Sequence, residues 1–324
     1  MRRYFLSCDW GTSNFRLAAV DPEAVMTKMG SSKTIAERSS DRGIRDLTES
    51  GSFGEYLAAE IAALLEESNL PDDGSPVWVS GMASSTIGWH ELEYAALPFD
   101  LDGTNCVYEA IRHSALGNRE AYLVSGIRAE ADVLRGEESQ ILGVFSHPEY
   151  RRFRSDASLV LPGTHSKHVS VSHETVDAFQ SFISGELFEL LRHQSVLRHS
   201  VHTESVNLSS RETRDAFLRG VRCGRDSSIA PNLFRVRAEQ VLDGETAANG
   251  TAFLSGLILG DEIARSDVLR EDRPVLLCAS GPLLESYTAA FTEFSGLDVI
   301  TIPSSVSETA VARGQLVIQT RVQK

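Results

Sequence analysis

Short β-rich runs alternate with helix-patterned segments along this chain of 324 residues. The runs PVWVSGMAS at 76–84 and AYLVSG at 121–126 each contain a glycine at the expected strand end. Between the opening β-rich runs and these two, apolar residues recur every three to four positions over 53–65, which is helical spacing. Alternation of this kind is typical of α/β proteins, in which loops at the strand ends carry the chemistry. We therefore expect a mixed or parallel sheet flanked by helices.

The length favours two domains, because a single hydrophobic core seldom serves more than about 250–300 residues. Composition changes at SHPEYRRFRSD, residues 146–156, where a proline and a cluster of arginines precede a new β-rich run. This change predicts an N-terminal lobe over 1–148 and a C-terminal lobe over 149–324. Each half opens with a β-rich run, a turn of glycine and hydroxyl residues, and a second β-rich run, which indicates an internal duplication.

Charge and composition exclude several classes of protein. The net charge is −14 and the pI about 5.1, whereas a nucleic-acid footprint needs clustered Lys and Arg. The apolar stretches are too short to cross a membrane, and the opening residues lack the apolar region of a signal peptide. The four cysteines are scattered and form no C-x-x-C pair. We therefore expect a cytoplasmic protein without nucleic-acid or membrane partners; its oligomeric state stays open, a homodimer included.

The turn DWGTS, residues 9–13, combines groups that suit a phosphate ligand. Gly11 lets the backbone approach closely, consecutive amides form an anion-binding concavity, and Thr12 and Ser13 add hydroxyl donors. Asp9 would repel a phosphate unless a cation lay between them, as in a Mg²⁺–nucleotide. The alternative interpretation is an ordinary hairpin whose aspartate caps the turn.

Two further turns have the same character. Gly163-Thr164 lies between β-rich runs in LPGTHSKHV, and Ser280-Gly281 follows a β-rich run in CASGPLLESY. Pro282 then stands where a helix is expected to begin, and a free helix N-terminus suits an anion. The sequence contains no G-x-x-x-x-G-K-[ST], G-x-G-x-x-G, H-R-D or G-x-S-x-G motif. Three similar turns therefore indicate a nucleotide site of another type.

These motifs resemble a known family. The segment DWGTSNFR, 9–16, resembles the first phosphate-binding hairpin of sugar kinases in the superfamily of actin, heat-shock chaperones and hexokinase, above all the glycerol and xylulose kinase branch. Gly163-Thr164 resembles the second phosphate hairpin, and ASGPLL, 279–284, the adenosine-binding turn. More narrowly, the chain resembles the 2-dehydro-3-deoxygalactonokinase family through SGMASSTIGW, RGEESQILG, LPGTHSKHV, FISGELFELL, FLSGLILG and SGPLLESYTAAF. The resemblance runs from Tyr4 to about the last twenty residues.

The resemblance implies a two-lobed actin-like ATPase fold, also called ribonuclease H-like, with mixed sheets flanked by helices and the active site in the cleft between lobes. It implies that ATP and Mg²⁺ phosphorylate the C6 hydroxyl of 2-dehydro-3-deoxy-D-galactonate in galactonate catabolism. The alternatives are a kinase of another sugar or sugar acid, such as 2-dehydro-3-deoxygluconate or a hexose, and a non-catalytic ATP- or sugar-binding sensor of the same fold.

Phosphoryl transfer requires positioning, charge neutralisation and a base near the acceptor hydroxyl. In the glycerol kinase branch the catalytic carboxylate sits at the start of a helix shortly before the second hairpin, and RGEESQILG, 135–143, occupies that place here. The resemblance thus implies Glu137 as the base, with Asp9 as the other catalytic acid and metal ligand. Glu138 and Asp132 remain alternative bases, because Glu137 is one methylene longer than the aspartate of those relatives. Both glutamates would also stabilise a helix dipole without catalysis.

The remaining predicted contacts concern nucleotide and substrate. The resemblance assigns Arg16 to the terminal phosphate and assigns the nucleotide to Gly11, Thr12, Ser13, Gly163, Thr164, Ser280 and Gly281. A hydroxylated carboxylate needs hydroxyl and amide donors, which GMASSTIGW at 81–89 offers, so the predicted substrate residues are Ser84, Ser85, Trp89, His165 and Lys167. A metal pair of His165 and His168 is not favoured, because no third ligand stands nearby in the sequence. The segment 182–197 is expected to be a helix that packs into the core.

Overall fold

The structure is a computed structural model that describes residues 4–27, 34–48, 52–202 and 206–322. The chain forms two compact units. Unit 1 holds Met1–Ser155, Val171–Asp177 and Pro303–Lys324, and unit 2 holds Asp156–Ser170 and Ala178–Ile302. These units differ from the contiguous lobes 1–148 and 149–324 expected from the sequence, because the last helix returns to unit 1 and packs there.

The sheet of unit 1 is mixed, as predicted, with the strand order β3-β2-β1-β4-β8-β7. Its strands are β1 Phe5–Trp10, β2 Phe15–Val20, β3 Thr34–Ser40, β4 Val77–Gly81, β7 Tyr108–Ile111 and β8 Ala121–Val124. β1 pairs with β2 in the antiparallel and with β4 in the parallel sense. The predicted hairpin of two β-rich runs around a glycine-hydroxyl turn is therefore confirmed as β1–β2.

Helices cover both faces of this sheet. The face that carries Leu6, Cys8 and Trp10 packs against α2, Phe53–Glu67, in one apolar core. The other face carries Asp9 and Ser80 and meets α10, Ala310–Val322, which contacts β1 and β4. The smaller elements of unit 1 are α1 Pro22–Met26, β5 Ala95–Ala96, β6 Phe99–Asp100, β9 Ile127–Arg128, β10 Val133–Leu134, α3 Glu137–Ser146 and α9 Ser304–Ser307.

The helices α3 and α10 touch through their backbones. A Cβ on Gly314 of α10 would lie 1.8 Å from the Ser139 carbonyl oxygen of α3, and a Cβ on Gly143 would lie 1.7 Å from that of Ala310. The separation of the two helices is therefore smaller than side chains would permit. This packing fixes α10 against the N-terminal turn of α3.

Most of a second six-stranded sheet, with the strand order β15-β14-β11-β12-β13-β6, belongs to unit 2. The exceptions are β6 and the segment Val171–Asp177, which belong to unit 1; β6 pairs with Thr175 and Val176 of this segment. The other strands of the sheet are β11 Asp156–Leu161, β12 Ser166–Ser172, β13 Thr175–Phe182, β14 Val275–Leu277 and β15 Val299–Thr301. The helices of unit 2 are α4 Ser184–Gln194, α5 Arg211–Asp226, α6 Arg235–Asp243, α7 Ala247–Ala264 and α8 Gly281–Phe291. The second predicted hairpin is confirmed as β11–β12. No helix in the described ranges has the length and apolar composition needed to span a membrane.

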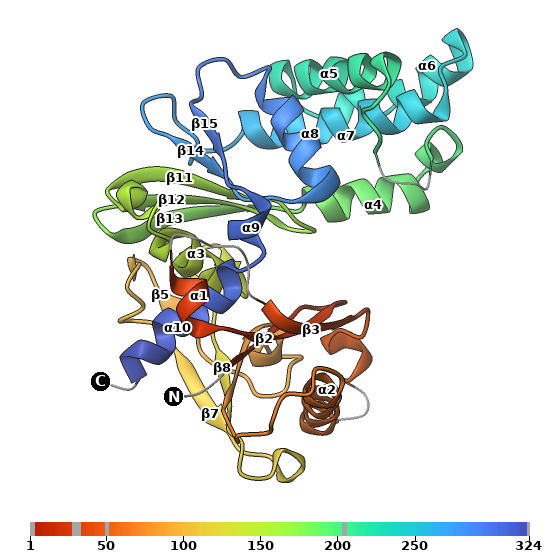
Figure 1. The fold of residues 1–324 in the computed structure, drawn as a ribbon. Helices are drawn as coiled ribbons and strands as arrows, with labels where there is room; N and C mark the ends of the chain where they lie inside the picture. Colours follow the sequence, from red (N-terminus) through yellow and green to blue (C-terminus); the bar gives the residue numbers. More distant parts are fainter. Residues whose placement is uncertain (1–3, 28–33, 49–51, 203–205, 323–324) are drawn as a thin grey trace. The chain divides into compact units, whose positions relative to one another are not determined.

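The helices α5 and α7 lie side by side in unit 2 (Figure 1). Four glycines make this possible, two on each helix: Gly220, Gly224, Gly256 and Gly260. A Cβ on any of them would lie 2.0–2.2 Å from a carbonyl oxygen of the facing helix. Backbone contact therefore replaces side-chain packing along this helix pair.

Substitution of Gly256 by alanine should destabilise unit 2. The new methyl group would lie 2.0 Å from the Phe217 carbonyl oxygen, so the helices must separate, at a cost of about 1–3 kcal/mol. Urea unfolding measures the loss. Gly296→Ala is the control, because the three atoms nearest to its methyl group would all belong to the flexible side chain of Glu271. Equal midpoints for the two variants would contradict the backbone contact.

Candidate active site

The β1–β2 turn is held by backbone hydrogen bonds. The Gly11 amide donates to the Asn14 carbonyl at 2.9 Å, which closes the turn. The carbonyls of Gly11 and Thr12 accept from the amides of Ile44 at 3.0 Å and Arg45 at 3.2 Å. A Cβ on Gly43 would lie 2.2 Å from the Thr12 carbonyl oxygen, so only glycine allows this approach. The turn carbonyls are thus engaged by the 43–46 loop, where they would not repel an anion.

A polar row crosses the sheet beside this turn. Cross-strand pairing places Ser39 opposite Arg16, Arg16 opposite Asp9, and Asp9 opposite Ser80. Paired residues share one face of a sheet, so the four side chains form a continuous line. Burial raises the pKa of the Asp9 carboxyl, and the Arg16 guanidinium lowers it by a smaller amount. Arg16 also forms an ion pair with Glu37 at 3.4 Å.

A cavity of about 520 Å³ lies over this row, lined by Asp9, Gly11, Asn14, Phe15, Arg16, Ser39, Ser40 and Asp41. Its two carboxylates fit the ligation of Mg²⁺, which usually takes one or two carboxylates together with the phosphates of a nucleotide. Within the described part of the chain, no three His, Cys, Asp or Glu side chains cluster as an all-protein metal site. The donor set therefore suits a metal that arrives with phosphates. Asp41 was not predicted from the sequence as a site residue, because only the pairing of β2 with β3 brings it to this cavity.

Glu137 and Glu138 open α3, as the sequence predicts for a catalytic helix start. Glu137 is half-buried, and its Oε2 accepts from the Arg135 amide at 2.9 Å. Glu138 is wholly buried; its Oε2 accepts from the Gly136 amide at 2.5 Å and its Oε1 from the Ser139 hydroxyl at 3.2 Å. Burial, together with the neighbouring Glu137 carboxylate, raises the pKa of Glu138 to about 8. Of the two glutamates, Glu137 is thus partly exposed and Glu138 is not.

The third candidate base, Asp132, lies in the turn between β9 and β10. Its Oδ1 accepts from the amide of Val133 at 2.7 Å, and its carbonyl accepts from Ala129 at 2.8 Å. These are contacts of a local turn, and β10 separates this residue from the start of α3. The arrangement therefore gives Asp132 a turn-forming role.

The loop after β4 carries the predicted substrate residues Ser84, Ser85 and Trp89. Both serines are buried, with hydroxyls that donate to the carbonyls of Val124 and Met82 at 2.7 Å each. Trp89 is half-buried and packs against the core of unit 1.

Arg135 anchors the loop after β4 through hydrogen bonds. Its guanidinium donates to the Ser84 carbonyl, to the Ser84 hydroxyl at 2.6 Å and to the Leu92 carbonyl at 3.3 Å. It also stacks on the Tyr94 ring at 4.1 Å. The two serine hydroxyls are therefore used within unit 1, as are the backbone amides of Ser85, Gly88 and Trp89, which donate to carbonyls of the same loop.

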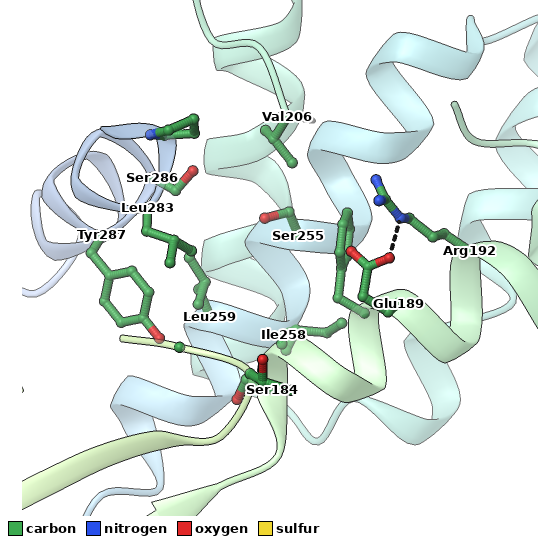
Figure 2. Close-up of a pocket in the computed structure, with 15 residues that line it drawn as sticks. Ser184, Glu189, Arg192, Val206, Ser255, Ile258, Leu259, Leu283, Ser286 and Tyr287 are labelled. Atoms are coloured by element: carbon green, nitrogen blue, oxygen red, sulfur yellow. Dashed lines mark hydrogen bonds and ion pairs between the residues drawn. The ribbon is translucent and has the colours of Figure 1, made fainter. Parts of the chain in front are cut away.

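Unit 2 contains a cavity of about 360 Å³. The second glycine-hydroxyl turn contributes Gly163 and Thr164, and the start of α8 contributes Pro282 and Leu283, directly after Ser280-Gly281. Figure 2 shows Leu259, Leu283 and Tyr287 on one side and the Glu189–Arg192 pair on the other. Much of the lining is apolar, with further side chains from Phe188, Val206 and Ile258. The second predicted turn thus lines this cavity, and the two residues that follow the third turn line it too.

The helix α4 both packs into the core and lines this cavity. Leu187 and Leu191 pack on the apolar cluster of unit 2, as the sequence predicts. Phe188 lines the cavity, and Arg192 stacks over its ring at 5.2 Å while donating to Glu189 at 2.9 Å. Gly185 approaches the second turn so closely that a Cβ would lie 2.5 Å from the Gly163 carbonyl oxygen. Sequence reasoning missed Phe188 and Arg192 as site residues, since helical periodicity does not separate a cavity face from a core face.

The residues that follow the second turn alternate between the two faces of β12. The hydroxyl of Ser166 bonds to that of Tyr287 at 2.8 Å, and both nitrogens of the buried His168 are engaged, with Ser266 and Glu262. Lys167 points to the opposite face and is buried, contrary to the usual exposure of lysine. His165 is exposed and bonds to Glu186 at 2.6 Å. His165 and His168 thus bond to separate partners.

Comparison with known proteins agrees with these observations. The profile of a family described as 2-keto-3-deoxy-galactonokinase matches residues 9–317. A protein of Rhizobium meliloti (strain 1021) named "Probable 2-dehydro-3-deoxygalactonokinase DgoK1" is 33% identical over 270 residues, which are 81% of this chain and 79% of that protein. The 2-dehydro-3-deoxygalactonokinase of Escherichia coli (strain K12) is 26% identical over 319 residues, 97% of each chain.

Two solved structures are similar in fold. The crystal structure of a protein from Sinorhizobium meliloti assigned as a 2-dehydro-3-deoxygalactonokinase has a TM-score of 0.78 and 28% identity, over 98% of this chain and 97% of that chain. Component A of (R)-2-hydroxyglutaryl-CoA dehydratase from Acidaminococcus fermentans has a TM-score of 0.51 and 13% identity over the whole of both chains. The second likeness concerns the fold alone.

Replacement of Glu138 by glutamine should flatten the dependence of stability on pH. The pKa of Glu138 is about 8 in the folded protein against 4.5 for an unperturbed glutamate, so its proton is bound more tightly in the folded state. Its contribution to stability is full below about pH 4.5 and is lost as the pH rises through about 8. Urea unfolding across this range measures the slope. Glu149→Gln, at an exposed position, should keep the wild-type slope; equal slopes for all three proteins would contradict the assignment.

Proposed function

Because the chain belongs to the 2-keto-3-deoxy-galactonokinase family and is a carbohydrate kinase, we propose that it transfers the terminal phosphoryl group of ATP to the C6 hydroxyl of 2-dehydro-3-deoxy-D-galactonate. The product is 2-dehydro-3-deoxy-6-phospho-D-galactonate, an intermediate of galactonate catabolism. The observation that carries the proposal is the family match over residues 9–317, which include the turns and acids described above. The mixed α/β fold of actin-like ATPases supports many activities and does not by itself choose one.

Unit 2 is proposed to bind the nucleoside of ATP. A mostly apolar cavity of about 360 Å³ with a few polar groups at its edge suits a flat base and a ribose. Phe188 offers a ring face, and Glu189, Arg192 and Ser255 offer polar atoms. Thr164, with Gly163, would then lie toward the phosphates, as would Ser280 and Gly281. These assignments rest on the family resemblance of the two turns, together with the cavity that Gly163 and Thr164 line and that Ser280 and Gly281 adjoin through Pro282.

Unit 1 is proposed to act on the phosphates. The hydroxyls and backbone amides of Thr12 and Ser13 would donate to phosphate oxygens, Gly11 would let the backbone approach them closely, and Arg16 would neutralise part of their charge. Asp9 would hold Mg²⁺ on the phosphates; when bound, this ion neutralises charge that develops during transfer. The half-buried position of Asp9 over a cavity of about 520 Å³ supports this role.

Glu137 is proposed as the base. Its carboxylate would accept the proton of the C6 hydroxyl while the hydroxyl oxygen forms a bond to the γ-phosphorus and the bond from that phosphorus to the ADP oxygen breaks. The complete burial of Glu138 and the turn contact of Asp132 support the choice of Glu137 over these two acids. The loop 81–89, which Ser84 and Ser85 shape, would meet the sugar acid through Trp89 and through backbone amides other than those of Ser85, Gly88 and Trp89, which donate within the loop. His165 and Lys167 are proposed to contact the substrate carboxylate or the transferred phosphate.

A cytoplasmic location is also proposed. All four cysteines lie within the described residues and none of them forms a disulfide. Free thiols are usual in a reducing compartment, which also supplies ATP.

The acceptor is tested by an assay that couples ADP release to NADH oxidation. ADP should form only when 2-dehydro-3-deoxy-D-galactonate is added, with kcat/KM at least tenfold above that for its C4 epimer, 2-dehydro-3-deoxy-D-gluconate, and no turnover of hexoses, as differential binding of one hydroxyl would give (roughly 1–3 kcal/mol). Equal kcat/KM for the two epimers would overturn the assignment of the acceptor. ADP release that does not depend on any sugar acid would overturn the kinase assignment.

Glu137→Gln should lower kcat by about 10²–10⁴-fold, the range that a general base contributes. The amide cannot take the hydroxyl proton, but it keeps the size of the side chain, so the KM for ATP should stay within a few-fold of wild type. Steady-state kinetics and ATP titration measure the two effects. Glu130→Gln serves as the control, because Glu130 is exposed in the β9–β10 turn. Wild-type turnover of Glu137→Gln would remove this residue from the chemistry.

A further inference from the structure

A chain of buried hydrogen bonds starts at Gln315 in the last helix. Its Nε2 donates to the Cys8 carbonyl of β1 at 3.0 Å and to the Ser80 hydroxyl of β4 at 2.9 Å. The hydroxyls of Ser80 and Ser139 are 2.6 Å apart, and Ser139 donates to Glu138 at 3.2 Å. Gln315, Ser80, Ser139 and Glu138 are each 0% exposed. The last helix is thus connected by polar groups to β1, β4 and the start of α3.

Each end of this chain adjoins an acid with a proposed role. Cys8 directly precedes Asp9, and Ser80 lies opposite Asp9 in the β1–β4 pairing. Glu138 directly follows Glu137. The hydrogen-bond chain therefore contacts both segments that carry these acids, on the sheet face that bears Asp9.

The direction of donation along the chain is set by Gln315. A side-chain NH₂ group only donates, so the Ser80 oxygen accepts from it and the Ser80 hydroxyl is free to donate to Ser139. Ser139 then donates to Glu138, so the three bonds that lead from Gln315 through Ser80 and Ser139 all point toward the buried carboxyl. The Gln315 NH₂ group at one end can only donate, and the Glu138 carboxyl at the other end accepts, so the direction of every hydrogen bond between them is fixed. An apolar side chain at position 315 would remove this constraint.

Side-chain packing alone does not explain why a glutamine occupies position 315. The Oε1 of Gln315 is buried and has no partner within the described ranges, so this side chain carries an unsatisfied group that leucine or methionine would not. Polar groups kept in an interior despite such a cost are often those that fix one geometry.

We propose that Gln315 is a positioning residue for phosphoryl transfer, which fixes the ends of β1 and β4 against the start of α3 and thereby sets the places of Asp9 and Glu137. The proposal rests on the roles proposed above for these two acids. Gln315 itself touches no substrate; it acts through Cys8, Ser80 and Ser139. A glutamine that only fills space would affect the stability of unit 1 and leave catalysis intact, so the two interpretations differ in what they predict for kcat.

The test compares Q315L with Q319L. Gln319 lies one turn further along α10 and lines a separate surface cavity with Trp78 and Tyr122. Q315L should lower kcat about 10–100-fold with the KM for ATP within twofold of wild type, because small displacements of a catalytic group carry penalties of that size. Q319L should keep the wild-type kcat. Q315L with a wild-type kcat, whatever its stability, would overturn the proposal.

A second variant, S139A, and amide NMR spectra provide two further tests. If Q315L does not fold, S139A breaks the same chain at a serine and should show the same selective loss of kcat; in a folded Q315L, the double variant should lose less than the product of the two single losses, since both remove one network. Independently of activity, the amide NMR signals of Gly81 and Gly136 should shift in Q315L and not in Q319L. Unmoved signals would overturn the positioning role, whereas failure of the acceptor assay would overturn only the proposed function.

Discussion

The ends of β1 and β4 and the start of α3 meet through their backbones, and the arrangement of acids in unit 1 depends on this contact. Gly81 has a φ of 98°, and a Cβ there would lie 2.6 Å from the Trp10 carbonyl oxygen. Gly136 has a φ of 103°, and its Cβ would lie 3.2 Å from the Cα of Gly81. Since glycine alone adopts such backbone angles at little cost, three segments approach more closely than side chains allow. Asp9 lies one residue from Trp10 and Glu137 one residue from Gly136.

Close backbone approach also shapes unit 2. Gly185 lies against the second glycine-hydroxyl turn, and the Glu186 amide donates to the Thr164 carbonyl at 3.0 Å. This contact ties the turn to the first residues of α4, whose Phe188 lines the cavity. Tyr287 closes the cavity from α8 and is fixed by hydrogen bonds to Ser166 and Glu262 at 2.8 Å each. A cavity whose walls are held this firmly needs little ordering when a ligand enters.

Features encoded by short segments could be predicted from the sequence. The two hairpins, β4, and the start of α3 at Glu137 follow from local patterns of apolar residues and glycine, and the structure has all of them. Features that depend on distant pairing could not. Nothing local shows that Asp41 shares a cavity with Asp9, or that residues 303–324 join the first half of the chain. Gln315 reads as a polar position on a helix until its partners in β1 and β4 are known. The serines after β4 show a related limit, because a hydroxyl in a loop indicates a donor but not whether the protein itself uses it.

The return of residues 303–324 to unit 1 affects the order in which the protein acquires its structure during synthesis. A ribosome completes every residue of unit 2, through Ile302, before it makes Arg313 and Gln315. Until then the carbonyls of Val25 and Cys8, to which these side chains donate at 2.8 and 3.0 Å, lack their interior partners. The half translated first therefore lacks these contacts until the half translated second has been made, so the two units cannot be completed strictly in N-to-C order.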